Sequence, residues 1–185
     1  MKILTNILFL LLLGYLCFRF IRLIIKLKRP AVFPITEEDL KAIRRQPQKA
    51  VNLPVISEQK SGFFVMGVTL LGLLLLAVFK LQDSTIQTPY LIIPLVALIN
   101  FNQSWNLFAI VEDGVLCGGR FVPWKRIQSY QFEQIDTNHR FYGYSPEVNS
   151  GYELKISTRF FEVGCIVTSE ERKEKLTKIL DARLS

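Results

Sequence analysis

The apolar positions of this chain gather in three long stretches within its first 111 residues. The chain carries no charge from Ile3 to Phe18 and stays largely apolar as far as Ile25. It is again uncharged from Ser61 to Phe79 and from Ser84 to Val111, with an apolar peak at Tyr90–Phe101. An apolar helix of about 20 residues spans the roughly 30 Å hydrocarbon core of a bilayer. The pattern therefore predicts helices that cross a membrane.

We expect one transmembrane helix in residues 1–29 and a transmembrane helical hairpin in residues 61–104, with Lys80–Thr88 as its polar turn. A cleaved signal peptide is disfavoured, because only Lys2 is basic at the start and no small-x-small exit follows. A soluble, buried hairpin is disfavoured as well, because the second and third stretches lack a polar face.

From Trp105 onward the pattern changes to short alternating segments, which predict β-strands. Two-residue turns at Asp113-Gly114 and Gly118-Gly119 separate the first three of them. The predicted strands are Trp105–Glu112, Val115–Cys117, Arg120–Trp124, Ile127–Gln134, Tyr152–Ser157 and Phe161–Val167. Thr168 and Glu171 fit a capping box that would start a final helix. The apolar face of that helix holds Leu176, Ile179, Leu180 and Leu184.

Residues 30–60 are expected to be a linker that carries one short helix. Thr36 suits the cap of this helix, and the three acidic residues that follow it suit the helix dipole. Ile35 and Leu40 occupy the positions of a hydrophobic staple, and the helix must end before Pro47. Two interpretations remain open, a helix lying on an anionic membrane surface or a solvated connector.

These segments together predict an α+β membrane protein. Its expected parts are an N-terminal transmembrane helix (1–29), a cytoplasmic linker (30–60), a transmembrane hairpin (61–104) and a small antiparallel β domain closed by a C-terminal helix (105–185).

The net charge of +7 comes entirely from the part of the chain that carries the apolar stretches. Residues 1–103 hold 12 basic and 5 acidic residues, and the rest of the chain holds 11 of each. Basic residues near membrane segments mark the cytoplasmic side, and the first two stretches are separated by many of them. These are Lys26, Lys28, Arg29, Lys41, Arg44, Arg45, Lys49 and Lys60.

We therefore expect an N-terminus outside and a C-terminal domain in the cytoplasm, on a bacterial inner membrane or a thylakoid-type membrane. Since the basic excess has this explanation, nucleic acid is not an expected partner. The end of the first helix is the predicted membrane-interface site, where long basic side chains reach the lipid headgroups. Its residues are Arg19, Arg22, Lys26, Lys28 and Arg29.

The polar residues form no recognisable catalytic, cofactor or metal site. His139 is the only histidine and stands in the polar loop 136–150, so it is expected at the surface. Cys17, Cys117 and Cys165 are too few and too widely spaced for a disulfide framework or a zinc site, and are expected to be small buried hydrophobes. The sequence contains no phosphate-binding glycine loop and no nucleophile elbow. We expect a protein that is not an enzyme and holds no cofactor or metal.

Two groups of residues are candidates for contacts with lipid or with a partner. The first group is Trp124, Lys125 and Arg126. It suits lipid headgroups, or it ends a strand with the indole in the core and two solvated charges. The second group, in loop 136–150, is Phe141, Tyr142 and Tyr144. It suits a partner interface or plain packing.

A β-meander with hairpin turns and a closing amphipathic helix resembles the pleckstrin-homology-like (PH-like) domains of bacterial membrane proteins. The stretches Ile110-Val-Glu-Asp-Gly-Val and Gly119-Arg-Phe-Val-Pro-Trp-Lys-Arg-Ile127, followed by Tyr130, are similar to the signature of an uncharacterised bacterial family. This resemblance covers residues 100–182 and implies a PH-like fold but no activity. The architecture also resembles that of the photosystem I assembly factor of plastids and cyanobacteria, although the extra N-terminal segment departs from it.

The function we expect is that of a scaffold, assembly or regulatory subunit that contacts other membrane proteins through its cytoplasmic domain. A lipid-sensing module at the membrane surface is the alternative, and a photosystem assembly factor is a further one. A hydrolase with an unrecognised site is the interpretation that the sequence supports least.

Overall fold

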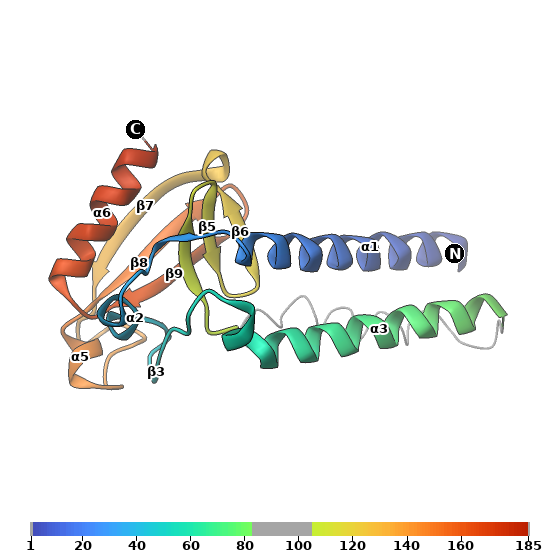
Figure 1. Cartoon of the computed structure of the whole chain (residues 1–185), viewed down its shortest axis with the longest axis horizontal. Coiled ribbons are helices and arrows are strands. Elements are labelled where there is room, and N and C mark those ends of the chain that lie inside the picture. Colours follow the sequence, from blue (N-terminus) through green and yellow to red (C-terminus); the bar gives the residue numbers. More distant parts are fainter. Residues whose placement is uncertain (1, 83–104, 185) are drawn as a thin grey trace.

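The computed structural model describes residues 2–82 and 105–184. Its two longest helices, α1 (Lys2–Leu27) and α3 (Lys60–Gln82), leave the β domain on the same side and run next to each other (Figure 1). The segments Asn6–Leu27 and Ile56–Phe79 are long and apolar enough to cross a membrane. They correspond to the first two predicted membrane segments. The third, around residues 90–101, lies outside the described residues, so the hairpin stays a prediction.

The described residues form two antiparallel sheets, and all six strands predicted after residue 104 are among their strands. The first sheet has the order β1 (Ala31–Phe33), β4 (Phe108–Val111), β5 (Gly114–Cys117) and β6 (Arg120–Pro123). The second has the order β3 (Lys49–Ala50), β2 (Ile43–Gln46), β9 (Glu162–Val167), β8 (Tyr152–Thr158) and β7 (Ile127–Gln134). The short helices are α2 (Glu37–Ala42), η1 (Ile56–Gln59), η3 (Trp124–Arg126) and α5 (Pro146–Asn149), and the last helix is α6 (Glu170–Leu184).

The expected linker turns out to be part of the β domain. Strand β1 pairs with β4, and β2 pairs with β9, so that Ile43 lies opposite Val167. The β structure therefore begins at Ala31 rather than at Trp105. Strands of two to four residues are too short to show alternation, which is why the sequence did not predict them.

Helix α2 also belongs to the folded domain rather than to a solvated connector. Thr36 caps it as predicted, since its hydroxyl accepts from the backbone N–H of Asp39 at 3.2 Å. The helix ends earlier than the limit set by Pro47, because β2 starts at Ile43. The staple is not formed. Leu40 packs against the core, but Ile35 is 67% exposed.

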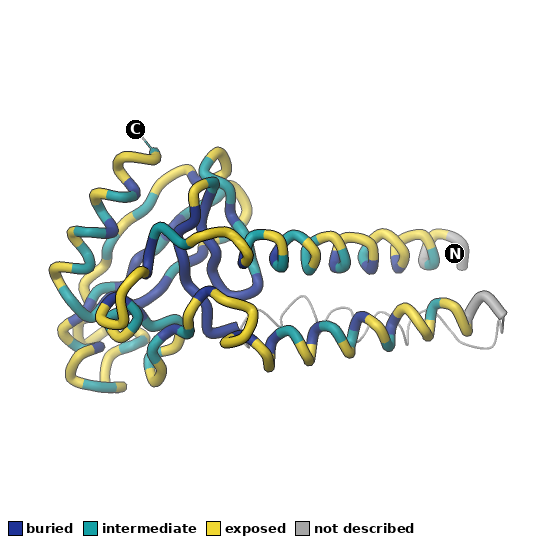
Figure 2. Tube along the Cα trace, viewed as in Figure 1, coloured by how far each residue is buried: buried dark blue, intermediate teal, exposed yellow. Residues whose placement is uncertain are grey.

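The first sheet is buried on both faces, so β4 and β5 contain buried residues only (Figure 2). One face packs on the second sheet and on α6, whose Leu176 and Leu180 are fully buried as predicted. This core includes Phe108, Ile110 and Val115 from the first sheet and Leu154, Ile156 and Val163 from the second. The other face packs on the ends of α1 and α3 and includes Ala109, Val111, Leu116, Leu23, Leu27 and Trp105. The long helices are therefore joined to the domain by a continuous apolar core.

The structure corrects two local predictions, the position of the first hairpin turn and the cap of the last helix. The first turn is formed by Glu112 and Asp113, while Gly114 already starts β5. Glycine is required there because a Cβ would collide with the carbonyl oxygen of Val122 on β6. The second turn is as predicted, with Gly118 at a φ of 58°. The capping box of the last helix is wrong, because the Thr168 hydroxyl donates instead to the carbonyl oxygen of Ala42 at 3.2 Å.

Candidate functional site

The basic end of α1 contacts the β5–β6 hairpin of the domain. Arg19 donates from Nε and Nη2 to the carbonyl oxygen of Gly119, at 3.2 and 3.0 Å. The cationic groups of Arg22 and Lys26 lie 4.8 and 4.7 Å from the centre of the Phe121 ring, within cation–π range. These polar contacts lie beside the apolar core that joins α1 to the first sheet.

Asp113, in the β4–β5 turn, completes the junction. Lys26 forms an ion pair with its carboxylate, and Nη1 of Arg29 lies 3.1 Å from its Oδ2. Burial acts to raise the pKa of Asp113, but the hydrogen bond from Lys26 and the nearby charges outweigh it, so the pKa lies below its ordinary value. Four of the five predicted membrane-interface residues thus contact the β domain. Lys28 is exposed.

The predicted contact residues Trp124, Lys125 and Arg126 form the short helix η3. Trp124 packs partly into the core and donates from Nε1 to the carbonyl oxygen of Glu112 at 2.9 Å, so its indole anchors the turn. The two cations, in contrast, are exposed. They line a shallow depression of about 370 Å³ together with Arg159 and Phe160 from the β8–β9 turn.

We call Lys125, Arg126, Arg159 and Phe160 the basic–aromatic patch. Phe160 is 84% exposed, more than any other large hydrophobic side chain that the structure describes. Arg159 and Phe160 are not among the residues predicted from the sequence. The sequence feature that could have indicated them is an apolar residue next to an arginine in the short turn between two predicted strands. Only the fold, however, brings this turn next to η3.

The aromatic residues of loop 136–150 divide into two kinds. Phe141 packs against a small separate core of Ile135, Val148 and Ile166, which corresponds to plain packing. Tyr142 and Tyr144 are 44% and 50% exposed. Helix α5, which closes this loop, lies at the end of the domain away from α1 and α3 (Figure 1).

The expectation that the His139 side chain lies at the surface is wrong. Its side chain is 6% exposed, and its Nε2 lies 3.0 Å from Oε2 of Glu153. Glu153 is itself buried and also forms an ion pair with Arg140. The prediction failed because Glu153 lies on the sheet face opposite the main core, and the loop that carries His139 folds back over that face.

Glu133, His139 and Glu153 form a group of metal-ligand type within the described part of the chain. Both carboxylates are already paired with cations, since Lys155 binds Glu133 and Arg140 binds Glu153. Nδ1 of His139 accepts from the backbone N–H of Phe141 at 3.2 Å, so Nε2 carries the proton that it donates to Glu153. The group is therefore satisfied as a hydrogen-bonded network and suits a structural role better than metal binding.

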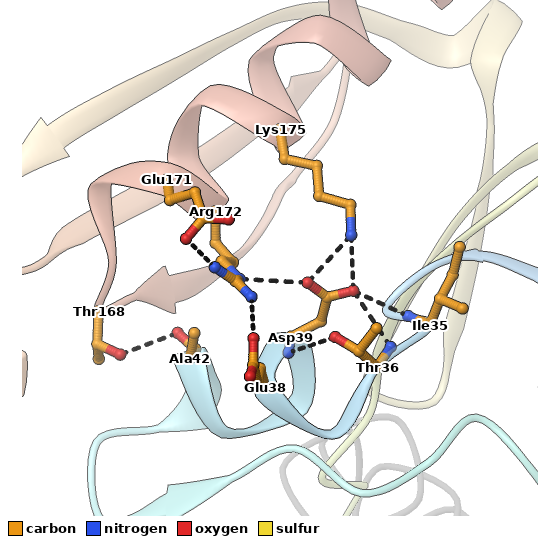
Figure 3. A network of polar contacts seen from close by, with 9 residues as sticks. All are labelled: Ile35, Thr36, Glu38, Asp39, Ala42, Thr168, Glu171, Arg172 and Lys175. Carbon is orange, nitrogen blue, oxygen red and sulfur yellow. Dashed lines mark hydrogen bonds and ion pairs between the residues drawn. The ribbon is translucent and has the colours of Figure 1, made fainter.

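Asp39 is the centre of a second polar network, which joins α2 to α6 (Figure 3). Its side chain is fully buried, and Lys175 donates to Oδ2 at 2.8 Å while Nε of Arg172 lies 3.3 Å from Oδ1. The backbone N–H groups of Ile35 and Thr36 also donate to Oδ2. Burial acts to raise the pKa of Asp39, but these hydrogen bonds outweigh it and lower the pKa to about 2.

Cys117 and Cys165 are buried, as predicted, and Cys17 is partly buried in α1. Burial raises the pKa of the Cys117 thiol and raises that of Cys165 well above the ordinary value. Both thiols therefore stay protonated and unreactive at neutral pH.

Searches of protein-family models, of curated proteins and of solved structures found no match to this chain.

Proposed function

We propose that this protein is a non-catalytic scaffold of a membrane-protein complex, which holds its β domain at the cytoplasmic surface of the bilayer for a protein partner. The observation that carries the proposal is the junction between α1 and the first sheet. A domain tethered by a loop would move freely, whereas this one is joined to the helix by an apolar core and by contacts of Arg19, Lys26 and Arg29. These contacts therefore limit how far the domain can move relative to α1.

The exposed surfaces of the two long helices support the membrane location. On α1 the exposed large apolar side chains include Leu4, Ile7, Leu8, Leu10, Leu11, Tyr15, Phe18, Ile21 and Ile25. On α3 they include Phe64, Val68, Leu71, Leu74, Leu75, Val78 and Phe79. Soluble proteins rarely expose apolar patches of this extent, and lipid chains cover them without cost.

The orientation follows from charge. The basic residues of the 26–60 region favour the cytoplasmic side for the domain, with the N-terminus outside. Trp105, the first described residue after α3, packs on Gly62 at the domain end of that helix. This suits a third crossing by the apolar segment that precedes Trp105. We further propose a PH-like fold for the domain, which is supported by two antiparallel sheets and the closing helix α6.

The surface that we assign to the partner is the outer part of loop 136–150. Tyr142 and Tyr144 are exposed there, and α5, which closes the loop, lies at the end of the domain away from α1 and α3. Aromatic side chains on a loop held by a rigid scaffold are typical of protein interfaces. Phe141 and the network of His139 and Glu153 hold the base of this loop in place.

The test is an affinity purification of the full chain from native membranes in mild detergent, with mass spectrometry of the proteins that co-purify. We expect a stoichiometric membrane-protein partner for the natural chain, and its loss in the Tyr142→Ser/Tyr144→Ser variant. Phe160→Ser is the control, because it removes an aromatic residue that is even more exposed, at 84%, from another surface. A chain that purifies alone, or a partner that is retained by the tyrosine variant, would contradict the proposal.

A further inference from the structure

The basic–aromatic patch combines three cations with an exposed apolar ring, and nothing in the domain uses it. Within the described part of the chain, Lys125 and Arg126 form no ion pair, and Arg159 contacts the Phe160 ring at 5.5 Å from its centre. Glu162, the next carboxylate along the hairpin, accepts from the Ser157 hydroxyl at 3.0 Å. An exposed phenylalanine that is surrounded by uncompensated cations is costly in water and suits the boundary between water and lipid.

A series of contacts brings this patch to the end of α1. Arg19 binds the carbonyl oxygen of Gly119 in the β5–β6 turn, and the next residue, Arg120, stacks 4.9 Å from the centre of the Phe161 ring. Phe161 directly follows Phe160 in the β8–β9 turn. That turn lies on the side of the domain nearer α1, whereas α5 lies at the opposite end (Figure 1).

The level of the bilayer surface follows from α1 itself. The helix is uncharged from Ile3 to Phe18 and carries Arg19, Arg22 and Lys26 in its last turns. At 1.5 Å per residue, the eight steps from Arg19 to Leu27 cover about 12 Å, enough to cross the headgroup region of one leaflet. Strand β6 contacts α1, and Arg120 at the start of β6 contacts Phe161, so we infer that the β8–β9 turn lies near the level of these turns.

We propose that the basic–aromatic patch docks on anionic phospholipid headgroups of the bilayer that α1 and α3 cross. Phe160 enters the interface between headgroups and acyl chains, while Lys125, Arg126 and Arg159 bind lipid phosphates around it. The inference rests on the proposed membrane location and adds a second, lipid-dependent contact to it. Through this contact the lipid composition sets how firmly the domain lies on the surface.

The experiment uses the full chain in vesicles of phosphatidylcholine alone and in vesicles of phosphatidylcholine with phosphatidylglycerol. A nitroxide is attached at Gln128→Cys, because Gln128 is exposed and lines the same depression without belonging to the patch. The background is Cys17→Ala, and the buried thiols of Cys117 and Cys165 are kept because they stay unreactive. The measurement is the collision rate of the nitroxide with a water-soluble nickel complex, and a nitroxide at Tyr144→Cys serves as the distant reference.

We expect the collision rate at position 128 to fall several-fold in the anionic vesicles and to be unchanged at position 144. The variant Lys125→Gln/Arg126→Gln/Arg159→Gln should restore the rate of the neutral vesicles, and so should Phe160→Ser. The matched control is Lys41→Gln/Lys49→Gln/Lys178→Gln, which removes the same charge from exposed residues elsewhere and should not restore it.

A collision rate at position 128 that is equal in both lipids overturns the inference, as does a restoration by the control variant. Flotation of the vesicles tests the membrane location independently of the patch, so the two proposals can fail separately. Chains that float with both kinds of vesicle keep the membrane location even when the patch proposal fails. Chains that do not float contradict the membrane location itself.

Discussion

Gly62 stands where the first turn of α3 meets Trp105. A Cβ at this position would lie 2.7 Å from Cδ2 of the indole, closer than side chains approach. The ring has no room to move, because Trp105 is 1% exposed and meets Phe63 edge to face with centroids 4.7 Å apart. Gly67, in the same helix, has nothing within 4 Å of its Cβ position.

The two glycines therefore predict opposite outcomes for the same substitution. Gly62→Ala should destabilise the protein by about 1–3 kcal/mol through overpacking. Gly67→Ala should be neutral or stabilise it by about 0.5–1 kcal/mol, because alanine loses less backbone entropy in a helix. Thermal unfolding of the full chain in detergent, followed by tryptophan fluorescence, measures both, and equal shifts for the two variants would speak against the tight packing at Trp105.

His139 leads to a prediction about metal. Because its Nε2 already donates to Glu153, a bound ion would have to displace that proton and the cations on both carboxylates. We expect neither a chelator nor added zinc to change the unfolding temperature. Glu153→Gln should lower it, since a buried carboxylate that accepts from His139 and Arg140 is lost. A zinc-dependent rise in the unfolding temperature that Glu153→Gln abolishes would argue for a metal site instead.

At the scale of elements, Asp39 is the residue that joins α2 to α6. Asp39→Asn should cost about 2 kcal/mol of unfolding free energy, because a buried acceptor loses its charge toward Lys175 and Arg172. Glu38→Gln is the matched control on the same helix. Its carboxylate lies 2.7 Å from Arg172, but the side chain is 79% exposed, so its loss should cost less than about 1 kcal/mol. Chemical denaturation of the two variants measures both losses of unfolding free energy. A larger loss for Glu38→Gln than for Asp39→Asn would contradict the prediction.

The same carboxylate predicts a pH dependence. Its pKa in the folded protein is about 2, against an ordinary value of 3.8, so ionised Asp39 stabilises the fold fully above about pH 4. This contribution, about 2 kcal/mol, should be lost as the pH falls from about 4 to 2. The difference in stability between the natural chain and Asp39→Asn should therefore be present at pH 7 and shrink toward pH 2. A difference that does not depend on pH would mean that shape rather than charge accounts for the effect.

At the scale of the whole molecule, the junction at Asp113 decides whether the domain and the helices behave as one body. Asp113→Asn should destabilise the protein by about 1–2 kcal/mol, because Lys26 is only 13% exposed and loses its charged partner. Its neighbour in the turn supplies the control. Glu112→Gln alters an exposed side chain and should stay within about 0.5 kcal/mol. Limited proteolysis and thermal unfolding compare the stability of the Asp113→Asn and Glu112→Gln variants. Equal effects of the two substitutions would mean that the ion pair does not hold the junction.

The orientation of the whole chain has its own test. A cysteine introduced at Lys80, at the far end of α3, should react with an impermeant thiol reagent added to intact cells. A cysteine at Tyr144 should react only after the membrane is opened. The reverse pattern would invert the proposed topology.

The sequence by itself determined the long helices, the cap of α2 at Thr36, the six later strands and the apolar face of α6. Each of these depends on residues that are neighbours along the chain, because helix and strand periods and cap spacings are local properties. The third apolar segment and its hairpin rest on the sequence alone.

Only the tertiary structure decided the rest. Arg19 and Gly119 are 100 positions apart, and Asp39 and Lys175 are 136 apart, so no local pattern relates them. The same holds for β1 and β2, whose few residues become strands only because β4 and β9 offer them edges, and for β3, which pairs with β2. Likewise, Glu153 reaches His139, and the turn that carries Phe160 reaches η3, only when the sheets pack. Such contacts depend on how distant segments meet in space, and that is set by the packing of the whole core rather than by the order of neighbouring residues.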